Sequence, residues 1–122
     1  MKIVDSNILI YITDKRVNIN DIICKNEEYA ISIVTYMEVL GYNFKSIKEQ
    51  VYMEDLISLF TTIEIDMDIA NKVIDLRREY KVKLPDAIIC ATAILNNAVL
   101  ISNDIKLKNI KELKLQILEN KK

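Results

Sequence analysis

The sequence predicts an α/β fold in which a central parallel sheet is covered by helices on both faces. Short apolar runs alternate along the chain with longer segments whose apolar residues recur at helical spacing. The short runs are apolar at successive positions, which is typical of parallel strands buried on both sides. Only one Gly and one Pro occur among 122 residues, so little of the chain suits a flexible linker. We therefore expect one domain spanning residues 1–122.

The first half of the chain predicts two strand-and-helix units followed by a longer helix. Polar residues that can cap a helix follow the first apolar run, and Gly41 is placed where it would end the second helix. The expected elements are a strand at 2–5, a helix at 6–13, a short helix at 18–26, a strand at 29–33 and helices at 35–41 and 46–60.

The second half predicts two strands in the sheet, a pair of helices between them and a last strand at the edge. Pro85 lies where the first turn of a helix tolerates it, and the segment after it is apolar almost all round. We expect this helix to be central and buried. The expected elements are a strand at 62–65, a helix at 66–80, a helix at 86–97, a strand at 98–102 and an edge strand at 113–118.

Composition excludes several kinds of chemistry. The chain has no His, so it lacks the usual general base, the Ser-His and Cys-His nucleophile systems and all imidazole metal ligands. Seventeen basic and eighteen acidic residues give a net charge of −1, which excludes the global positive field of a non-specific nucleic-acid binder. Cys24 and Cys90 are expected to be two buried, reduced thiols. No transmembrane helix or signal peptide is predicted, which favours the cytoplasm.

Four acids stand where the predicted fold would gather them. Asp5 and Asp104 each follow a predicted strand, and the carboxyl ends of parallel strands meet at one edge of a sheet. Asp86 begins the apolar helix, and residues expected to be buried flank Glu38 on both sides. Each acid also has a purely structural explanation. Asp5 would cap a helix, Asp86 would complement a helix dipole, Glu38 would form a capping box with Thr35, and Asp104 would serve a turn.

A cluster of these acids would need a cation or a proton. Two carboxylates about 4 Å apart repel by about 4 kcal/mol near a protein surface. Because no His or Cys pair is available, Mg²⁺ or Mn²⁺ is favoured over Zn²⁺, and such an ion suits phosphodiester hydrolysis. Without metal we expect at least one acid with a raised pKa. Asp86 is the expected holder, since desolvation disfavours its charge although the helix dipole acts the other way.

Four segments of the chain resemble the four acidic motifs of PIN-domain nucleases, in the same order and over nearly the whole chain. They are Val4-Asp5-Ser6-Asn7, residues 32–38, Leu84-Pro85-Asp86-Ala87 and Ile101-Ser102-Asn103-Asp104. The nearest resemblance is to the VapC-like toxins of toxin–antitoxin pairs. This chain departs from the motif at one place, since these proteins often carry Thr or Arg near the fourth acid, where this chain has Ser102 and Asn103.

The resemblance implies a PIN-like three-layer sandwich and a metal-dependent endoribonuclease. Asp5, Asp86 and Asp104 would hold the metal, Glu38 would complete the site with a role in orienting the attacking water, and Asn7 and Ser102 would support the ligands. It also implies an antitoxin partner and a homodimer. Basic residues near the acids would form a rim that contacts RNA, with solvated surface charge as their alternative. They are Lys15, Arg16, Lys83, Lys106 and Lys108.

Two other functions remain open from the sequence. A catalytically silent PIN fold would keep its acids for stability or for binding a partner. An aspartate-based phosphatase would use Asp5 as its nucleophile, but such sites usually carry an Asp-x-Asp pair, and Asn7 occupies the second position here.

Overall fold

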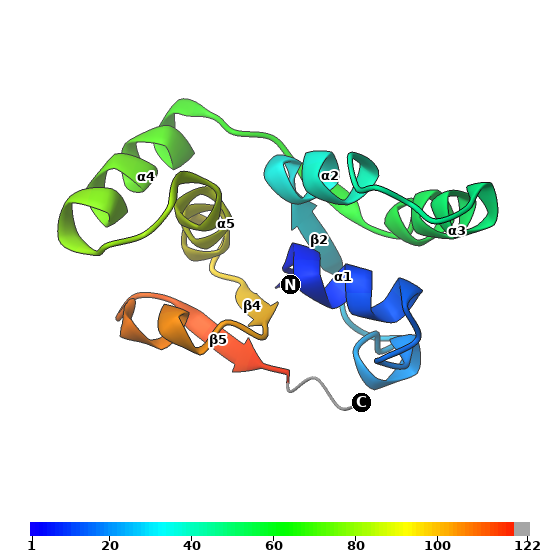
Figure 1. Ribbon diagram of the computed structural model, residues 1–122. Helices are drawn as coiled ribbons and strands as arrows, with labels where there is room; N and C mark the ends of the chain where they lie inside the picture. Colours follow the sequence, from blue (N-terminus) through cyan, green and yellow to red (C-terminus); the bar gives the residue numbers. More distant parts are fainter. Residues whose placement is uncertain (119–122) are drawn as a thin grey trace.

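A computed structural model describes residues 1–118 of the chain, and a five-stranded parallel sheet lies at its centre (Figure 1). Every strand pairing is parallel, as predicted. The order across the sheet is β3-β2-β1-β4-β5, so the last strand lies at an edge, also as predicted. The strands are β1 (Lys2–Val4), β2 (Tyr29–Ser32), β3 (Thr61–Ile63), β4 (Val99–Ser102) and β5 (Lys114–Ile117).

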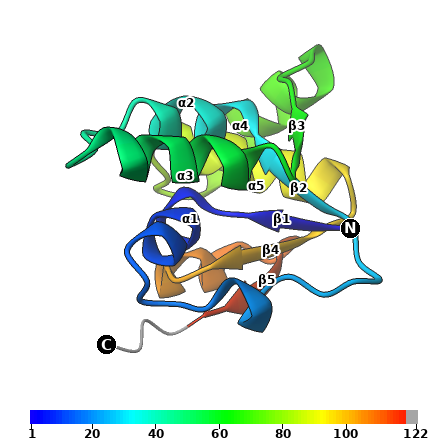
Figure 2. The ribbon, with the colours of Figure 1, turned by 90° about the vertical axis from the view of Figure 1, so that its right-hand side faces the viewer.

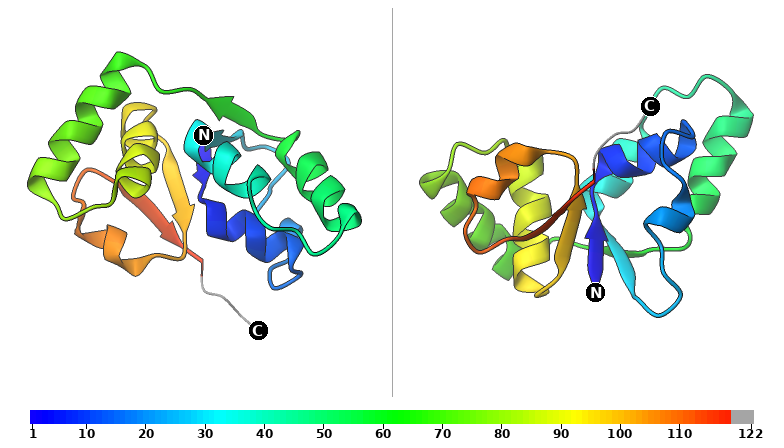
Figure 3. Two further views of the ribbon diagram at one scale, coloured as in Figure 1. Left: turned by 45° about the horizontal axis from the view of Figure 1, so that its top comes forward. Right: turned by 90° about the horizontal axis from the view of Figure 1, so that it is seen from below.

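Helices cover both faces of the sheet, which confirms the predicted three-layer α/β architecture (Figure 3). Helices α4 and α5 lie on one side, and α1, α2 and α3 lie on the other (Figure 1). The helices are α1 (Ser6–Thr13), α2 (Ile33–Leu40), α3 (Ile47–Ile57), α4 (Met67–Glu79) and α5 (Leu84–Leu95), with short 3-10 turns η1 (Ile19–Asp21) and η2 (Ile105–Asn109). None of these described helices is long and apolar enough to cross a membrane.

Successive residues of the inner strands supply two separate cores. One core contains Ile3 of β1 and Leu100 of β4 and is covered by α4 and α5. The other contains Val4 and Ile101, the next residues of the same strands, with α1 and α3 packed over it. Because strand side chains alternate between the faces of a sheet, both faces need apolar residues. This explains why the central strands carry successive apolar residues, Ile3-Val4 in β1 and Val99-Leu100-Ile101 in β4.

The predicted helix at residues 18–26 is wrong, since only the three residues of η1 are helical there. The side chain of Tyr29 explains the difference. Its hydroxyl donates to the carbonyl of Ile22 at 2.8 Å and accepts from the backbone N–H of Cys24 at 2.9 Å. Both backbone groups would be needed to continue a helix, so the tyrosine holds this segment as a loop.

The start of α2 also differs from the prediction. The helix begins at Ile33 rather than at residue 35, because the hydroxyl of Ser32 accepts the backbone N–H of Val34 at 3.1 Å and caps it. Helix α5 begins at Leu84, with Pro85 in its first turn as predicted. It is indeed central, and six of its residues are buried.

The strand order reverses between β1 and β4. From β1 the chain builds β2 and β3 on one side and then crosses to build β4 and β5 on the other. Figure 2 shows β1 and β4 side by side, both running toward the start of α1. In open α/β sheets, ligands bind outside the carboxyl ends of the strands at such a reversal. Asp5 and Asp104 follow these two strands.

Candidate active site

Asp5 is fixed at this reversal by three hydrogen bonds. Its backbone N–H donates to the carbonyl of Ile101 at 2.9 Å, which extends the pairing of β1 with β4 by one residue. Its Oδ1 accepts the backbone N–H of Ser6 at 2.8 Å and caps α1. Its Oδ2 accepts the hydroxyl of Ser102 at 2.7 Å. Asp5 is therefore a helix cap, as one explanation predicted, but only one of its oxygens is used for capping.

Ser102 joins the first acid to the fourth. Its hydroxyl, fully buried at the end of β4, donates to Asp5 and accepts the backbone N–H of Asp104 at 3.1 Å. Asp104 in turn caps η2, because its Oδ1 accepts the backbone N–H of Lys106 at 3.0 Å. The amide of Asn103 donates to the hydroxyl of Tyr11 on α1 at 2.8 Å. The loop after β4 is thus tied to α1 at two points.

Glu38 reaches the same place from α2. The buried hydroxyl of Ser6 donates to its Oε1 at 2.5 Å and lies 3.3 Å from the hydroxyl of Thr35. The proposed capping box of Thr35 and Glu38 is wrong, since Ser32 caps this helix and Glu38 lies well inside it. The sequence did not single out Ser6 for this role. Its position directly after Asp5, together with Thr35 one turn before Glu38, is the signal that was available.

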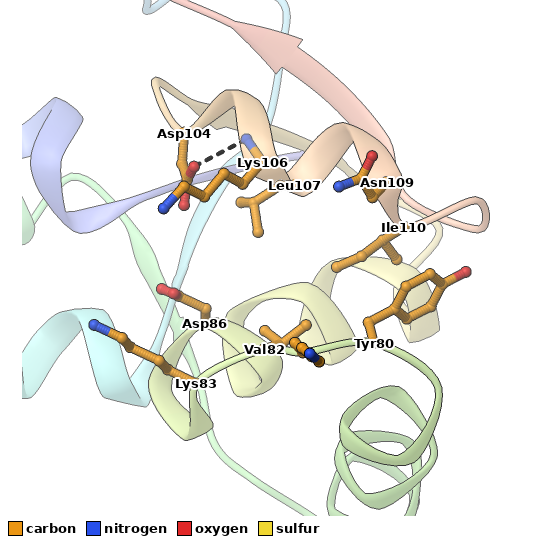
Figure 4. A pocket seen from close by; sticks show the side chains of 10 residues that line it. Tyr80, Val82, Lys83, Asp86, Asp104, Lys106, Leu107, Asn109 and Ile110 are labelled. Carbon is orange, nitrogen blue, oxygen red and sulfur yellow. Dashed lines mark hydrogen bonds between the residues drawn. The ribbon is translucent and has the colours of Figure 1, made fainter.

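Asp86 differs from the other three acids in having no hydrogen-bond partner among residues 1–118. It lies half-buried in the first turn of α5, whose cap residue Lys83 makes no side-chain capping bond. Asp86 and Asp104 line the same pocket, Asp86 from α5 and Asp104 from the start of η2 (Figure 4). The pocket has a volume of about 360 Å³. It is lined by Tyr80, Lys81, Val82, Lys83, Asp86, Asp104, Lys106, Leu107, Asn109 and Ile110.

Burial and mutual repulsion act on the charges of this cluster. Burial raises the pKa of Asp86, the charges of Asp5 and Asp104 raise it further, and Lys83 opposes them. This confirms the direction expected for Asp86. Burial also raises the pKa of Asp5, against the hydrogen bonds from Ser102 and Ser6, with Glu38 and Asp104 adding repulsion.

The four acids form one electrostatic group centred on Asp5. Glu38 and Asp104 both act on Asp5, and Asp5 and Asp104 both act on Asp86. Cys90 is buried as predicted, whereas the prediction is wrong for Cys24, which is exposed in the loop after η1. Burial and then the charges of Asp5, Asp86 and Asp104 raise the pKa of Cys90 to about 12. Its thiol therefore stays protonated and is a poor ligand.

The donor set fits a hard cation in its chemistry. It consists of carboxylate oxygens alone, which Mg²⁺ and Mn²⁺ prefer, and a cation would relieve the repulsion that the raised pKa values report. Among residues 1–118, no three acidic or Cys side chains are already arranged to ligate one ion, so the carboxylates would have to rotate toward it. Asn7 is exposed, and its side chain makes no hydrogen bond within the described part of the chain.

A family model described as PIN domain matches residues 2–113. The chain therefore belongs to the PIN domain family, in agreement with the resemblance of its four acidic motifs. A search of curated proteins found no match.

Several solved structures with this fold come from toxin–antitoxin systems. A chain of a toxin-antitoxin complex from Klebsiella pneumoniae is 34% identical with a TM-score of 0.79, covering 93% of this chain and 95% of that one. A chain of VapBC2 from Rickettsia felis, bound to a promoter DNA fragment, is 24% identical with a TM-score of 0.84 over 97% and 98% of the two chains. DNA-bound VapBC from Salmonella typhimurium is 19% identical with a TM-score of 0.85 over 95% and 96%. The chain is thus similar to VapC-like PIN toxins.

Proposed function

We propose that this PIN-domain protein is a metal-dependent endoribonuclease and the toxin of a toxin–antitoxin pair. The observation that carries the proposal is the group of four acids at the strand reversal. Ser6 and Ser102 join Asp5 to Glu38 and Asp104, and Asp86 belongs to the group through its charge interactions with Asp5 and Asp104. Similarity to a chain of a toxin–antitoxin complex at 34% identity supports the toxin assignment.

The proposed roles follow from how each side chain is held. Asp5, Asp86 and Asp104 would hold Mg²⁺ or Mn²⁺, which when bound activates water and neutralises charge on the phosphoryl oxygens. Ser102 orients Asp5 through its hydroxyl, and we keep Asn7 as a candidate support because it lies in the first turn of α1. Glu38 is held at Oε1 by Ser6, which leaves Oε2 to accept a proton from the attacking water.

The two other functions are less well supported. An aspartate-based phosphatase usually carries an Asp-x-Asp pair, and Asn7 occupies the second position here. A silent PIN fold would gain nothing from leaving Asp86 half-buried, close to two other acids and without a partner among residues 1–118.

Other parts of the proposal are an RNA substrate, an antitoxin, a homodimer, a cytoplasmic location and a single domain that includes residues 119–122, which lie outside the described ones.

Substitution Asp5→Asn tests the proposed activity. The amide keeps the acceptor that caps α1 but removes the charge, so the variant should fold and should lose the ion. We expect cleavage of single-stranded RNA in Mg²⁺ to fall by at least about 100-fold, more than the 10- to 100-fold typical of residues that only support a ligand. EDTA should abolish wild-type cleavage.

The matched control is Asp55→Asn, an exposed acid on α3 away from the cluster. It should cleave as the wild type does. Equal cleavage by Asp5→Asn and wild type, with both proteins folded by circular dichroism, would contradict the nuclease proposal and favour a silent PIN fold.

A further inference from the structure

The pocket between α5 and η2 combines two kinds of surface beside the acids. Val82, Leu107 and Ile110 give it an apolar wall (Figure 4). Lys81, Lys83 and Lys106 also line it and bring positive charge. Its volume of about 360 Å³ falls at the lower end of the range for sites that hold small ligands, about 300–1,000 Å³. It is therefore sized for one nucleotide unit rather than for a duplex.

The lysines of the pocket are not used by the fold. All three are exposed, and within residues 1–118 none forms an ion pair with a carboxylate. Lys83 acts on Asp86 only as a nearby charge. Three lysines against Asp86 and Asp104 give the pocket a positive balance, although the whole chain carries −1. This local charge suits a phosphate.

We propose that this pocket binds one unpaired nucleotide next to the phosphate that is cleaved, and that it thereby selects the cleavage sequence. The base would pack against Val82, Leu107 and Ile110, while Lys83 and Lys106 contact the phosphate. This inference rests on the proposed nuclease function, and it assigns the substrate contacts of that same site.

Asn109 is the side chain that reads the base. It lines the pocket from η2, it is exposed, and its amide offers both a donor and an acceptor to a base edge. The lysines are assigned to the phosphate, whose contacts carry no sequence information directly, and the apolar wall accepts any ring. Asn109 therefore determines specificity, whereas the lysines position the strand. Lys108 lies on the same 3-10 turn but does not line the pocket.

A binding experiment tests the phosphate contacts without relying on turnover. A fluorescein-labelled single-stranded RNA 10-mer is titrated into the Asp5→Asn protein in Mg²⁺ at several salt concentrations. Adding Lys83→Ala or Lys106→Ala should weaken binding and reduce the slope of log Kd against log salt by about 0.7 each. Lys111→Ala, an exposed lysine just beyond η2 that does not line the pocket, is the matched control and should leave the slope unchanged.

A cleavage experiment tests the base reading. A randomised RNA is digested and the cut ends are sequenced; the wild type should prefer one base beside the cut, and Asn109→Ala should flatten that preference. An unchanged preference in Asn109→Ala, or an equal loss of slope in Lys111→Ala, would overturn the proposal. So would pocket variants that weaken only an antitoxin complex. If wild-type protein cleaves no RNA, the nuclease proposal fails, and the titration alone decides whether the pocket binds a nucleotide.

Discussion

Single residues at the site serve the fold and the proposed chemistry together. Asp5 caps α1 with one oxygen and is held by Ser102 through the other, and Asp104 caps η2. A cap and a proposed ligand can therefore be the same residue. Asp86 is the exception, since the described residues offer its carboxylate no hydrogen bond. Its burial in the metal-free protein is a cost that the charge of Lys83 and the positive end of α5 oppose.

The burial of Asp86 makes the stability of the fold depend on pH, with a definite sign. The folded-state pKa of Asp86 lies above the unfolded value, near 3.8, so the native protein holds more protons between the two. Stability therefore falls as pH rises through that window. In EDTA at pH 7, we expect Asp86→Asn to melt at a higher temperature than the wild type, with the difference shrinking toward pH 4. Differential scanning calorimetry across this range measures it.

The matched control is Asp75→Asn, an exposed acid on α4, which should not reproduce the effect. Mg²⁺ should raise the melting temperature of the wild type but not of Asp86→Asn, because binding to the folded state stabilises it. A lower melting temperature for Asp86→Asn at pH 7 in EDTA would show that its charge is stabilised in a way that the structure does not explain.

Helix α1 and the loop after β4 hold each other in place. The hydroxyl of Tyr11 on α1 accepts a hydrogen bond from the side-chain amide of Asn103 at 2.8 Å. The guanidinium of Arg16 lies 5.4 Å from the centre of the Tyr11 ring. Asn103 directly precedes Asp104. The hydrogen bond therefore limits how far the fourth acid can move from the first, and the departure of this chain from the usual residues at 102 and 103 has a structural basis.

Substitution Tyr11→Phe removes this hydrogen bond and keeps the ring. We expect a loss of about 1 kcal/mol in the free energy of unfolding, measured by urea denaturation. RNA cleavage should fall because Asp104 is held less firmly. Tyr42→Phe is the matched control, since the Tyr42 ring packs on Phe44 and its hydroxyl has no hydrogen bond among the described residues. Equal stability and cleavage in Tyr11→Phe and wild type would show that the loop needs no such tie.

The elements also show what a sequence can and cannot predict. Strand positions and the parallel sheet followed from apolar runs, because both faces of the sheet are buried. The prediction of a helix at 18–26 was wrong because the hydroxyl of Tyr29 forms hydrogen bonds with backbone groups five and seven residues away. Ser6 was missed for the same reason, since its partner Glu38 is 32 residues distant. Local patterns predict elements, whereas single side-chain contacts across the fold do not show in them.

For the whole molecule, exposed apolar residues are the feature that the fold leaves unexplained. On α3, Ile47 and Val51 are one turn apart and are 80% and 46% exposed. Met37, on α2 beside Glu38, is 58% exposed. Scattered single residues need no explanation, but apolar residues on one helix face suit a partner. This supports the proposed homodimer through helices away from the acids, and an antitoxin over the acids themselves.

Assembly can be measured with the 14.2 kDa chain. Light scattering at micromolar concentration should give twice this mass, and Val51→Lys should give a monomer because a charge at the centre of an apolar interface is desolvated. The control is Ile74→Lys on α4, equally exposed at 46%, which should stay dimeric. Since the proposed antitoxin would cover four acids, its contacting segment should be basic and its affinity should fall with salt. A monomeric wild type, or a native operon that yields no co-purifying basic protein, would separate this chain from the toxin–antitoxin assemblies whose fold it shares.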